Sequence, residues 1–392
     1  MWYVALDVHA ETTVFSIRSA RGIVVRRDIV PTTAKDLRRA LGNIRGKVRI
    51  ACEVGQMAGW VKKTLQTELR EVVICDRRRT RLVLSGASKT DRIDADRLSE
   101  CLRLGSVHPV HLPEGRQLEL RRLGWHHLRM LNERRRAVQR LRALFLESGL
   151  RVPSPRRDPR RVPMRKLSGN ASKVVARAYI RQIELATALV EEAKSEFLSF
   201  ARQFEAYKLL QTVPHVGEIR AAMLIAVIGD PQRFHSRRAV WAYAGLAVVQ
   251  RSSAEHRVED GRVIRDRRRT GVHLSKIAQP VFKKLLRDIA LHASIRGGAF
   301  RKLYDAYLKR GKRPSIARLS LARRIAAIIF AVWRSGVPFN ERMVMIGKRK
   351  QVSGRASAQK LSHRCTPVDK ATALTICRPE IHTRTRRARG AG

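Results

Sequence analysis

Four acidic residues in the first quarter of the chain have the types and spacing of a metal-binding set. Asp7 ends an apolar run that opens the chain, and Glu53 directly follows a second apolar run. Asp91 and Asp94 lie three residues apart, a spacing that puts both side chains on one face of a helix. Gathered carboxylates repel one another unless cations neutralise them, and Mg²⁺ and similar hard divalent cations prefer oxygen ligands. The four residues therefore predict a metal site.

Two divalent cations held in this way would support phosphoryl transfer, because they activate the attacking group and stabilise the leaving oxygen. A second interpretation exists for Asp91 and Asp94, since the dipole of a helix favours acidic residues in its first turn. The metal interpretation is favoured because two strands would deliver Asp7 and Glu53 to the same place. Asp96 falls on another face of the helix, and we expect it to be a surface charge.

The elements expected around these acids have the order of a ribonuclease H-like fold. Three strands joined by short turns come first, followed by helix, strand, helix, strand and a final helix. In this order they are expected over residues 1–8, 13–19, 23–30, 33–45, 48–53, 57–69, 72–76 and 89–104. The handedness of strand–helix–strand units places the fourth strand beside the first. Asp7 and Glu53 would then meet near the middle of the sheet.

Two long helices are expected in the middle of the chain, over 117–150 and 171–205, with a connector rich in proline and arginine between them. Apolar residues recur every seven positions on both helices, namely Leu131, Val138, Phe145, Ile183, Val190, Phe197 and Phe204. This spacing is typical of an antiparallel hairpin or a dimerising coiled coil, with an ordinary helical bundle as an equal alternative. The first helix carries the basic run Arg134, Arg135 and Arg136, for which we expect contact with nucleic acid.

A mainly helical segment is expected after residue 207. The turn from Pro214 to Gly217 resembles a helix-hairpin-helix, in which the amides after the glycine bind a phosphate at a helix N-terminus. A plain turn between two helices is the alternative. Helices are expected over 274–292 and 297–336, and the basic sequence after about residue 345 predicts a disordered tail that binds nucleic acid.

Serines in the basic, flexible segment after Gln250 could attack a phosphodiester if they were deprotonated and flanked by cations. Taken alone this signal is weak, because serines beside arginines are common on protein surfaces. The same segment contains the run Arg267, Arg268 and Arg269, which we assign to nucleic-acid contact.

The net charge of +49 favours a polyanionic partner. A merely solvated basic surface is the alternative, but the chain is long and 44% hydrophobic, unlike a simple RNA-coating protein. The five cysteines form no CxxC pair, which argues against a zinc knuckle or a disulfide framework. The N-terminus does not resemble a signal peptide, and no apolar run is long enough to span a bilayer. We expect a cytoplasmic protein associated with the bacterial nucleoid.

Several motifs in order resemble the DEDD insertion-sequence transposases, the family of bridge-RNA-guided recombinases. They are Ala5 to Thr12, Glu53, Lys89 to Ala95, Val213 to Gly217, Gly229 to Phe234, Ala244 to Leu246, Ala299-Phe300, Tyr304 and Arg310 to Lys312. The resemblance implies four segments: a RuvC-like domain (1–112), a helical hairpin or coiled-coil linker (113–206), a C-terminal transposase domain with a serine loop (207–342) and a basic tail (343–392).

The resemblance also implies roles for single residues. Asp7, Glu53, Asp91 and Asp94 would bind two Mg²⁺ ions, and Ser253, with Ser252 as the alternative, would form a phosphoserine link to DNA. Ala254 stands where the family pattern has glycine. Further implications are a homodimer or homotetramer, donor and target DNA, and a structured guide RNA that pairs with both DNAs.

Two other functions remain open from the sequence. A RuvC-like junction nuclease would use metal-activated water and form no covalent intermediate. An inactive copy of such an element would keep the basic surface and bind nucleic acid without cleaving it.

Overall fold

The chain divides into two compact units, Met1–Ile346 and Gly347–Gly392. The computed structural model describes residues 1–76, 90–151, 162–252, 256–259, 262–265, 270–275 and 277–345. All described residues belong to the first unit, so nearly the whole of the predicted basic tail lies outside them. The finer division of the first unit into three domains stays a prediction.

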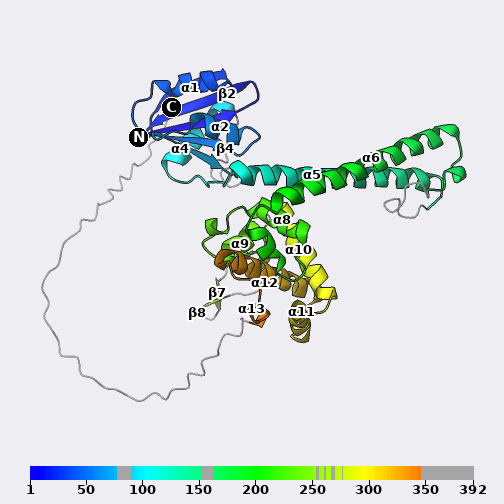
Figure 1. Ribbon diagram of the computed structural model, residues 1–392. Helices are drawn as coiled ribbons and strands as arrows, with labels where there is room; N and C mark the ends of the chain where they lie inside the picture. The colour runs from blue at the N-terminus through cyan, green and yellow to red at the C-terminus, as the bar shows by residue number, and fades with distance from the viewer. Residues whose placement is uncertain are drawn as a thin grey trace, which may run out of the picture. The chain divides into compact units, whose positions relative to one another are not determined.

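Five strands form one mixed sheet in the N-terminal part, in the order β3-β2-β1-β4-β5 (Figure 1). Their bounds are β1 Trp2–Val8, β2 Thr12–Ser19, β3 Val24–Pro31, β4 Val48–Glu53 and β5 Arg70–Cys75. The first three strands are antiparallel, while β4 lies parallel to both β1 and β5. The predicted meander and the predicted pairing of the first and fourth strands are confirmed. This arrangement is consistent with a ribonuclease H-like fold.

Helices cover both faces of this sheet. Helices α1 (Ala34–Gly42) and α2 (Ala58–Leu65) pack on the face that carries Val4, Leu6 and Ile50, whereas α4 (Asp91–Arg103) packs on the face that carries Ala5 and Ala51. Because side chains alternate between the two faces of a strand, this division follows directly from the sequence of β1 and β4. The small side chains of the two alanines let α4 lie close to the sheet. Both α1 and α2 end earlier than predicted, at Gly42 and Leu65.

Asp96 is not the surface charge that we expected. Its carboxylate accepts a hydrogen bond of 2.6 Å from the hydroxyl of Ser16, which is fully buried in β2, and pairs with Arg27 of β3 at 2.8 Å. The side chain of Asp96 is only 22% exposed. Asp96 does lie about 200° around the helix from Asp94, but that face of α4 meets β2 and β3 rather than solvent. Asp96 therefore fixes α4 to the sheet.

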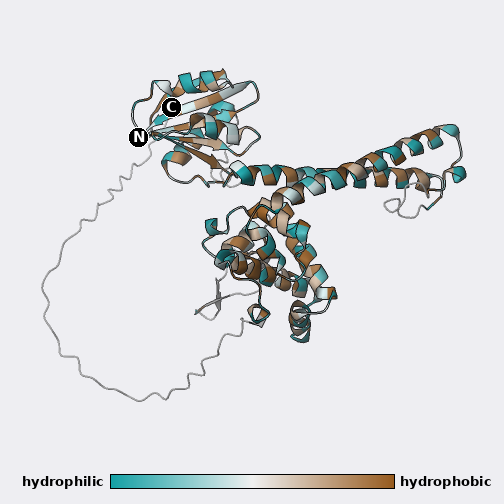
Figure 2. Ribbon diagram, in the orientation of Figure 1, coloured by the Kyte–Doolittle hydropathy of each residue, from teal (hydrophilic) through white to brown (hydrophobic). Residues whose placement is uncertain are grey.

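Two long helices follow, α5 (Gly115–Glu147) and α6 (Asn170–Ala201), and pack against each other along their length (Figure 1). Val138, Phe145 and Ile183 are buried in a core that the two helices share. Figure 2 shows hydrophobic and hydrophilic residues alternating along both helices, the pattern of helices with one buried face. The expected end of the second helix at residue 205 was wrong. Because α6 ends at Ala201, Phe204 lies beyond it and packs against the C-terminal core.

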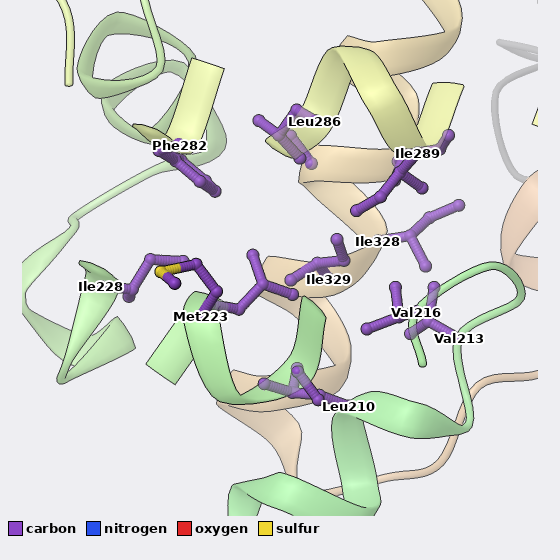
Figure 3. Packing of buried hydrophobic residues seen from close by; sticks show 14 of the residues in the cluster. Leu210, Val213, Val216, Met223, Ile228, Phe282, Leu286, Ile289, Ile328 and Ile329 are labelled. Carbon is purple, nitrogen blue, oxygen red and sulfur yellow. The ribbon is translucent and has the colours of Figure 1, made fainter. Parts of the chain in front are cut away.

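The C-terminal helices enclose the largest core of the described chain. Their bounds are α7 Ala206–Gln211, α8 Glu218–Ile228, α9 Arg237–Tyr243, α10 Pro280–Ile295, α11 Ala299–Lys309, α12 Pro314–Ser335 and α13 Arg342–Met345. Figure 3 shows Met223 of α8, Leu286 of α10 and Ile329 of α12 meeting in this core. The single helix expected over 297–336 is two helices, because Gly311 adopts a positive φ of 76° and Pro314 opens a new helix. None of the described helices is long and apolar enough to cross a membrane.

The segment after Gln250, which was expected to be flexible, takes part with the residues just before it in two antiparallel strand pairs. β6 (Val248–Ser252) pairs with β9 (Thr270–Leu274), and β7 (His256–Glu259) pairs with β8 (Arg262–Arg265). The β-branched residues in these short stretches favour strands, a signal that the many arginines obscured. The helix expected from residue 274 consequently begins later, at Pro280.

Replacement of Asp96 by alanine should destabilise the N-terminal domain without removing any of the four acids of the predicted metal set. The buried hydroxyl of Ser16 and the guanidinium of Arg27 would both lose their carboxylate partner, which should lower the free energy of unfolding by about 2 kcal/mol. Urea unfolding followed by circular dichroism would measure the change. The matched control is Glu68→Ala, an exposed acid in the same domain, which should change stability by less than about 0.5 kcal/mol. Equal stabilities of the two variants would contradict this role for Asp96.

Candidate metal centre

The parallel pairing of β1 and β4 brings two acidic residues to the same edge of the sheet. Leu6 is in register with Cys52, and Asp7 and Glu53 are the next residues of their strands. The alternation of side chains places both carboxylates on the face that carries Ala5 and Ala51, against which α4 packs.

Helix α4 begins at this edge and carries the other two acids. Thr90 caps the helix, its hydroxyl accepting a hydrogen bond from the backbone N–H of Ile93 at 3.3 Å. Asp91 and Asp94 both lie in the first turn, where the helix dipole stabilises negative charge. The cap at Thr90 therefore fixes where the helix begins, and with it the position of both carboxylates in the first turn.

All four predicted acids line one cavity of about 380 Å³: Asp7 and Glu53 from the sheet, and Asp91 and Asp94 from α4. The side chain of Asp7 is 30% exposed and that of Asp91 is 59% exposed, so the cavity is open to ions and to a large substrate. Residues that lie more than 80 positions apart in the sequence are brought together here by the strand pairing and by the packing of α4.

His9 belongs to the same cavity, although the sequence analysis gave it no role. Its Nε2 atom lies 3.5 Å from a carboxylate oxygen of Asp7 and 3.5 Å from a carboxylate oxygen of Asp91. One side-chain atom from each of these three residues lies within 4.8 Å of the others. The signal that could have identified His9 is its position two residues after Asp7, a spacing that returns a side chain to the same side of an extended chain.

Cys52 is a buried thiol at the lining of the same cavity. Burial, with the neighbouring Cys75, Asp7 and Glu53, raises the pKa of the Cys52 thiol to about 12. A thiol in this state stays protonated at neutral pH and is a poor nucleophile. Oxygen donors gathered in an open, negative cavity fit a divalent cation, and the residues present are therefore suited to hold one.

Ser253 and the run Arg267, Arg268 and Arg269 lie outside the described residues. The alternative, Ser252, ends strand β6, where its backbone is in register with Thr270 of β9. Which serine acts thus stays a prediction.

The remaining residues predicted to contact nucleic acid lie on helices. Arg134, Arg135 and Arg136 are on α5, where Arg136 pairs with Glu133 at 2.9 Å one helical turn away. Gly217 precedes α8 as its N-cap residue, and a Cβ atom added to it would meet nothing within 4 Å. Open space at this position leaves room for a phosphate to approach the start of α8.

Comparison with known proteins gives two family matches within the chain. Residues 4–148 match a model of DEDD transposases of the IS110 type, a segment that contains Asp7, Glu53, Asp91 and Asp94. Residues 207–305 match the family described as "Transposase IS116/IS110/IS902 family", a segment that contains both candidate serines.

One curated relative was found in Streptomyces coelicolor, the "Insertion element IS110 uncharacterized 43.6 kDa protein". It is 29% identical to this chain over 163 residues, which are 40% of this chain and 36% of the relative. The match therefore spans little more than a third of that protein's length. The two family matches together take in more than half of the 392 residues and lie in the expected order, so the chain belongs to the IS110 family of DEDD transposases.

Proposed function

We propose that this protein is a DNA transposase that excises and integrates an insertion sequence by metal-dependent strand cleavage and exchange. The observation that carries the proposal is the convergence of four carboxylates on one open cavity, within a chain whose two matched segments both belong to transposases.

In this proposal Asp7, Glu53, Asp91 and Asp94 would hold two Mg²⁺ ions beside a scissile phosphate. When bound, such ions activate the attacking oxygen and neutralise charge on the leaving oxygen. The protein's part is to fix the ligands: the sheet holds Asp7 and Glu53 at one edge, and the capped first turn of α4 holds Asp91 and Asp94 opposite them. Preorganised ligands of this kind need no rearrangement when the substrate arrives.

A serine of the C-terminal segment would supply the nucleophile, with Ser253 preferred to Ser252. The serine oxygen would form a bond to phosphorus as the bond between phosphorus and a sugar oxygen breaks, which leaves a phosphoserine link to the DNA. In the reverse reaction, a hydroxyl of a second DNA end would attack the same phosphorus and release the serine. A subunit assembly in which one subunit's serine completes another's acidic cavity would bring the two groups together, and we propose a homodimer or homotetramer.

The proposed partners are donor DNA, target DNA and a structured guide RNA. The net charge of +49 supports large contacts with nucleic-acid backbones. Arg134, Arg135 and Arg136 on α5 and the amides that follow Gly217 are the contacts that we propose within the described residues. Choice of DNA sequence would then depend on base pairing with the RNA rather than on side chains.

Replacement of Asp94 by asparagine should abolish DNA cleavage and strand transfer while leaving RNA binding nearly unchanged. One metal ligand is lost, which should reduce the cleavage rate by at least about 100-fold, whereas one carboxylate is a small part of the electrostatic contact with RNA. Cleavage of labelled DNA on gels and RNA binding by filter retention would measure the two effects. The matched control is Glu68→Gln, which should alter neither. Loss of cleavage and RNA binding together would show that Asp94 has a structural role instead.

Replacement of Ser253 by alanine should remove a covalent protein–DNA species. We expect wild-type protein, incubated with its RNA, labelled DNA and Mg²⁺, to give a DNA band of protein-linked size on a denaturing gel. The band should persist in Ser252→Ala and vanish in Ser253→Ala. Cleavage without a linked band in any variant would instead identify a metal-dependent junction nuclease, and a complete lack of reaction would favour an inactive copy.

A further inference from the structure

We infer that His9 is a direct metal ligand and that Asp7, His9 and Asp91 together bind one divalent cation that accepts a nitrogen donor, with Mn²⁺ preferred to Mg²⁺. This inference rests on the proposed function, because it concerns the same cavity. It adds a fifth ligand to the four carboxylates and changes the metal that the cavity should select.

The distances around His9 suit a shared cation. Its Nε2 atom lies 3.5 Å from the Asp7 oxygen and 3.5 Å from the Asp91 oxygen. For a six-coordinate ion with ligands at about 2.1 Å, two ligand atoms are separated by about 3.0 Å when adjacent and about 4.2 Å when opposite. Both separations of 3.5 Å fall between these limits, whereas they exceed the usual range for a hydrogen bond of about 2.7–3.2 Å.

The backbone of His9 is held in place by the turn between β1 and β2 and by the residue that follows β3. The N–H of His9 donates a hydrogen bond to the carbonyl of Thr12 at 3.0 Å, and its own carbonyl accepts one from the hydroxyl of Thr32 at 3.0 Å. The Thr32 hydroxyl also lies 2.8 Å from that of Thr13, which is fully buried. His9 is therefore fixed by its main chain, while its half-exposed side chain (52%) faces Asp7 and Asp91.

The identity of the donors determines which cation is preferred. Mg²⁺ prefers oxygen ligands and requires near-ideal octahedral geometry, whereas imidazole nitrogen is a good ligand for transition metals. A site with two carboxylates and one imidazole should therefore bind Mn²⁺ more tightly than a site with carboxylates alone, and should gain little for Mg²⁺. Asp94 and Glu53 line the same cavity and offer oxygen ligands only.

The test is pulsed electron paramagnetic resonance of untagged full-length protein with one equivalent of Mn²⁺. Coordination by imidazole gives a ¹⁴N modulation of the Mn²⁺ signal, which should be present in the wild type and lost in His9→Ala. Titration with Mn²⁺, followed by the same spectroscopy, should show that His9→Ala binds Mn²⁺ about 10-fold or more weakly than the wild type. Competition of Mg²⁺ with Mn²⁺ should show that the affinity for Mg²⁺ changes little. The matched control is His292→Ala, an exposed histidine on α10, which should behave as the wild type.

The outcomes separate this inference from the function on which it rests. Weaker Mn²⁺ binding by Asp7→Asn would show that the cavity binds metal. If the wild type then shows no ¹⁴N modulation, or if His9→Ala retains the modulation, the metal binds without His9 and only the present inference is wrong. If Asp7→Asn leaves Mn²⁺ binding unchanged, the cavity is not a metal site, and both the inference and the proposed function fail. Circular dichroism of each variant would confirm that the fold is retained.

Discussion

The parallel pairing of β1 with β4 is the constraint on which the candidate metal centre depends. The register that aligns Leu6 with Cys52 also aligns the ends of both strands, so that Asp7 and Glu53 leave the sheet at one edge. The same register decides which face each carboxylate occupies, because a shift by one residue would turn Glu53 towards α2. The central residues of both strands, Val4 to Leu6 and Ile50 to Cys52, are almost completely buried, and their burial makes such a shift costly. The position of two acids is thereby determined by hydrophobic packing elsewhere in the sheet.

Helix α4 must be held against this edge although the acids that it carries repel those of the sheet. Two unit charges about 4 Å apart near a protein surface interact with about 4 kcal/mol, more than the roughly 1.5–3 kcal/mol of one hydrogen bond to a charged group. Several contacts together are therefore needed to hold α4 against the sheet. Arg18 donates to the carbonyl of Asp96 at 2.9 Å and to the hydroxyl of Ser99 at 3.1 Å, beside the contacts of Asp96 with Ser16 and Arg27. Cations in the cavity would reduce the repulsion that these contacts oppose.

The sequence was most informative where local pattern and tertiary structure agree. The strand meander, the neighbouring first and fourth strands and the helix that begins near Asp91 followed from sequence periodicity and the handedness of strand–helix–strand units. The role of Asp96 could not be predicted, because the helix face that it occupies is buried by strands distant in the sequence. The strands β6 to β9 were missed because short β-branched stretches stand among many arginines. His9 was missed because its contact with Asp91 joins residues some 80 positions apart, and its spacing from Asp7 was not used. Helix ends such as Ala201 depend on packing that periodicity alone does not reveal.

The central claim is that Asp7, Glu53, Asp91 and Asp94 form one metal centre, and diffraction from crystals soaked in Mn²⁺ would test it most directly. The account predicts anomalous density inside the cavity that these residues line, within about 2.0–2.4 Å of carboxylate oxygens from both the sheet and α4. The density should disappear from crystals of Asp7→Asn. Anomalous density confined to other parts of the molecule, with the four carboxylates well ordered and the cavity empty, would contradict the account.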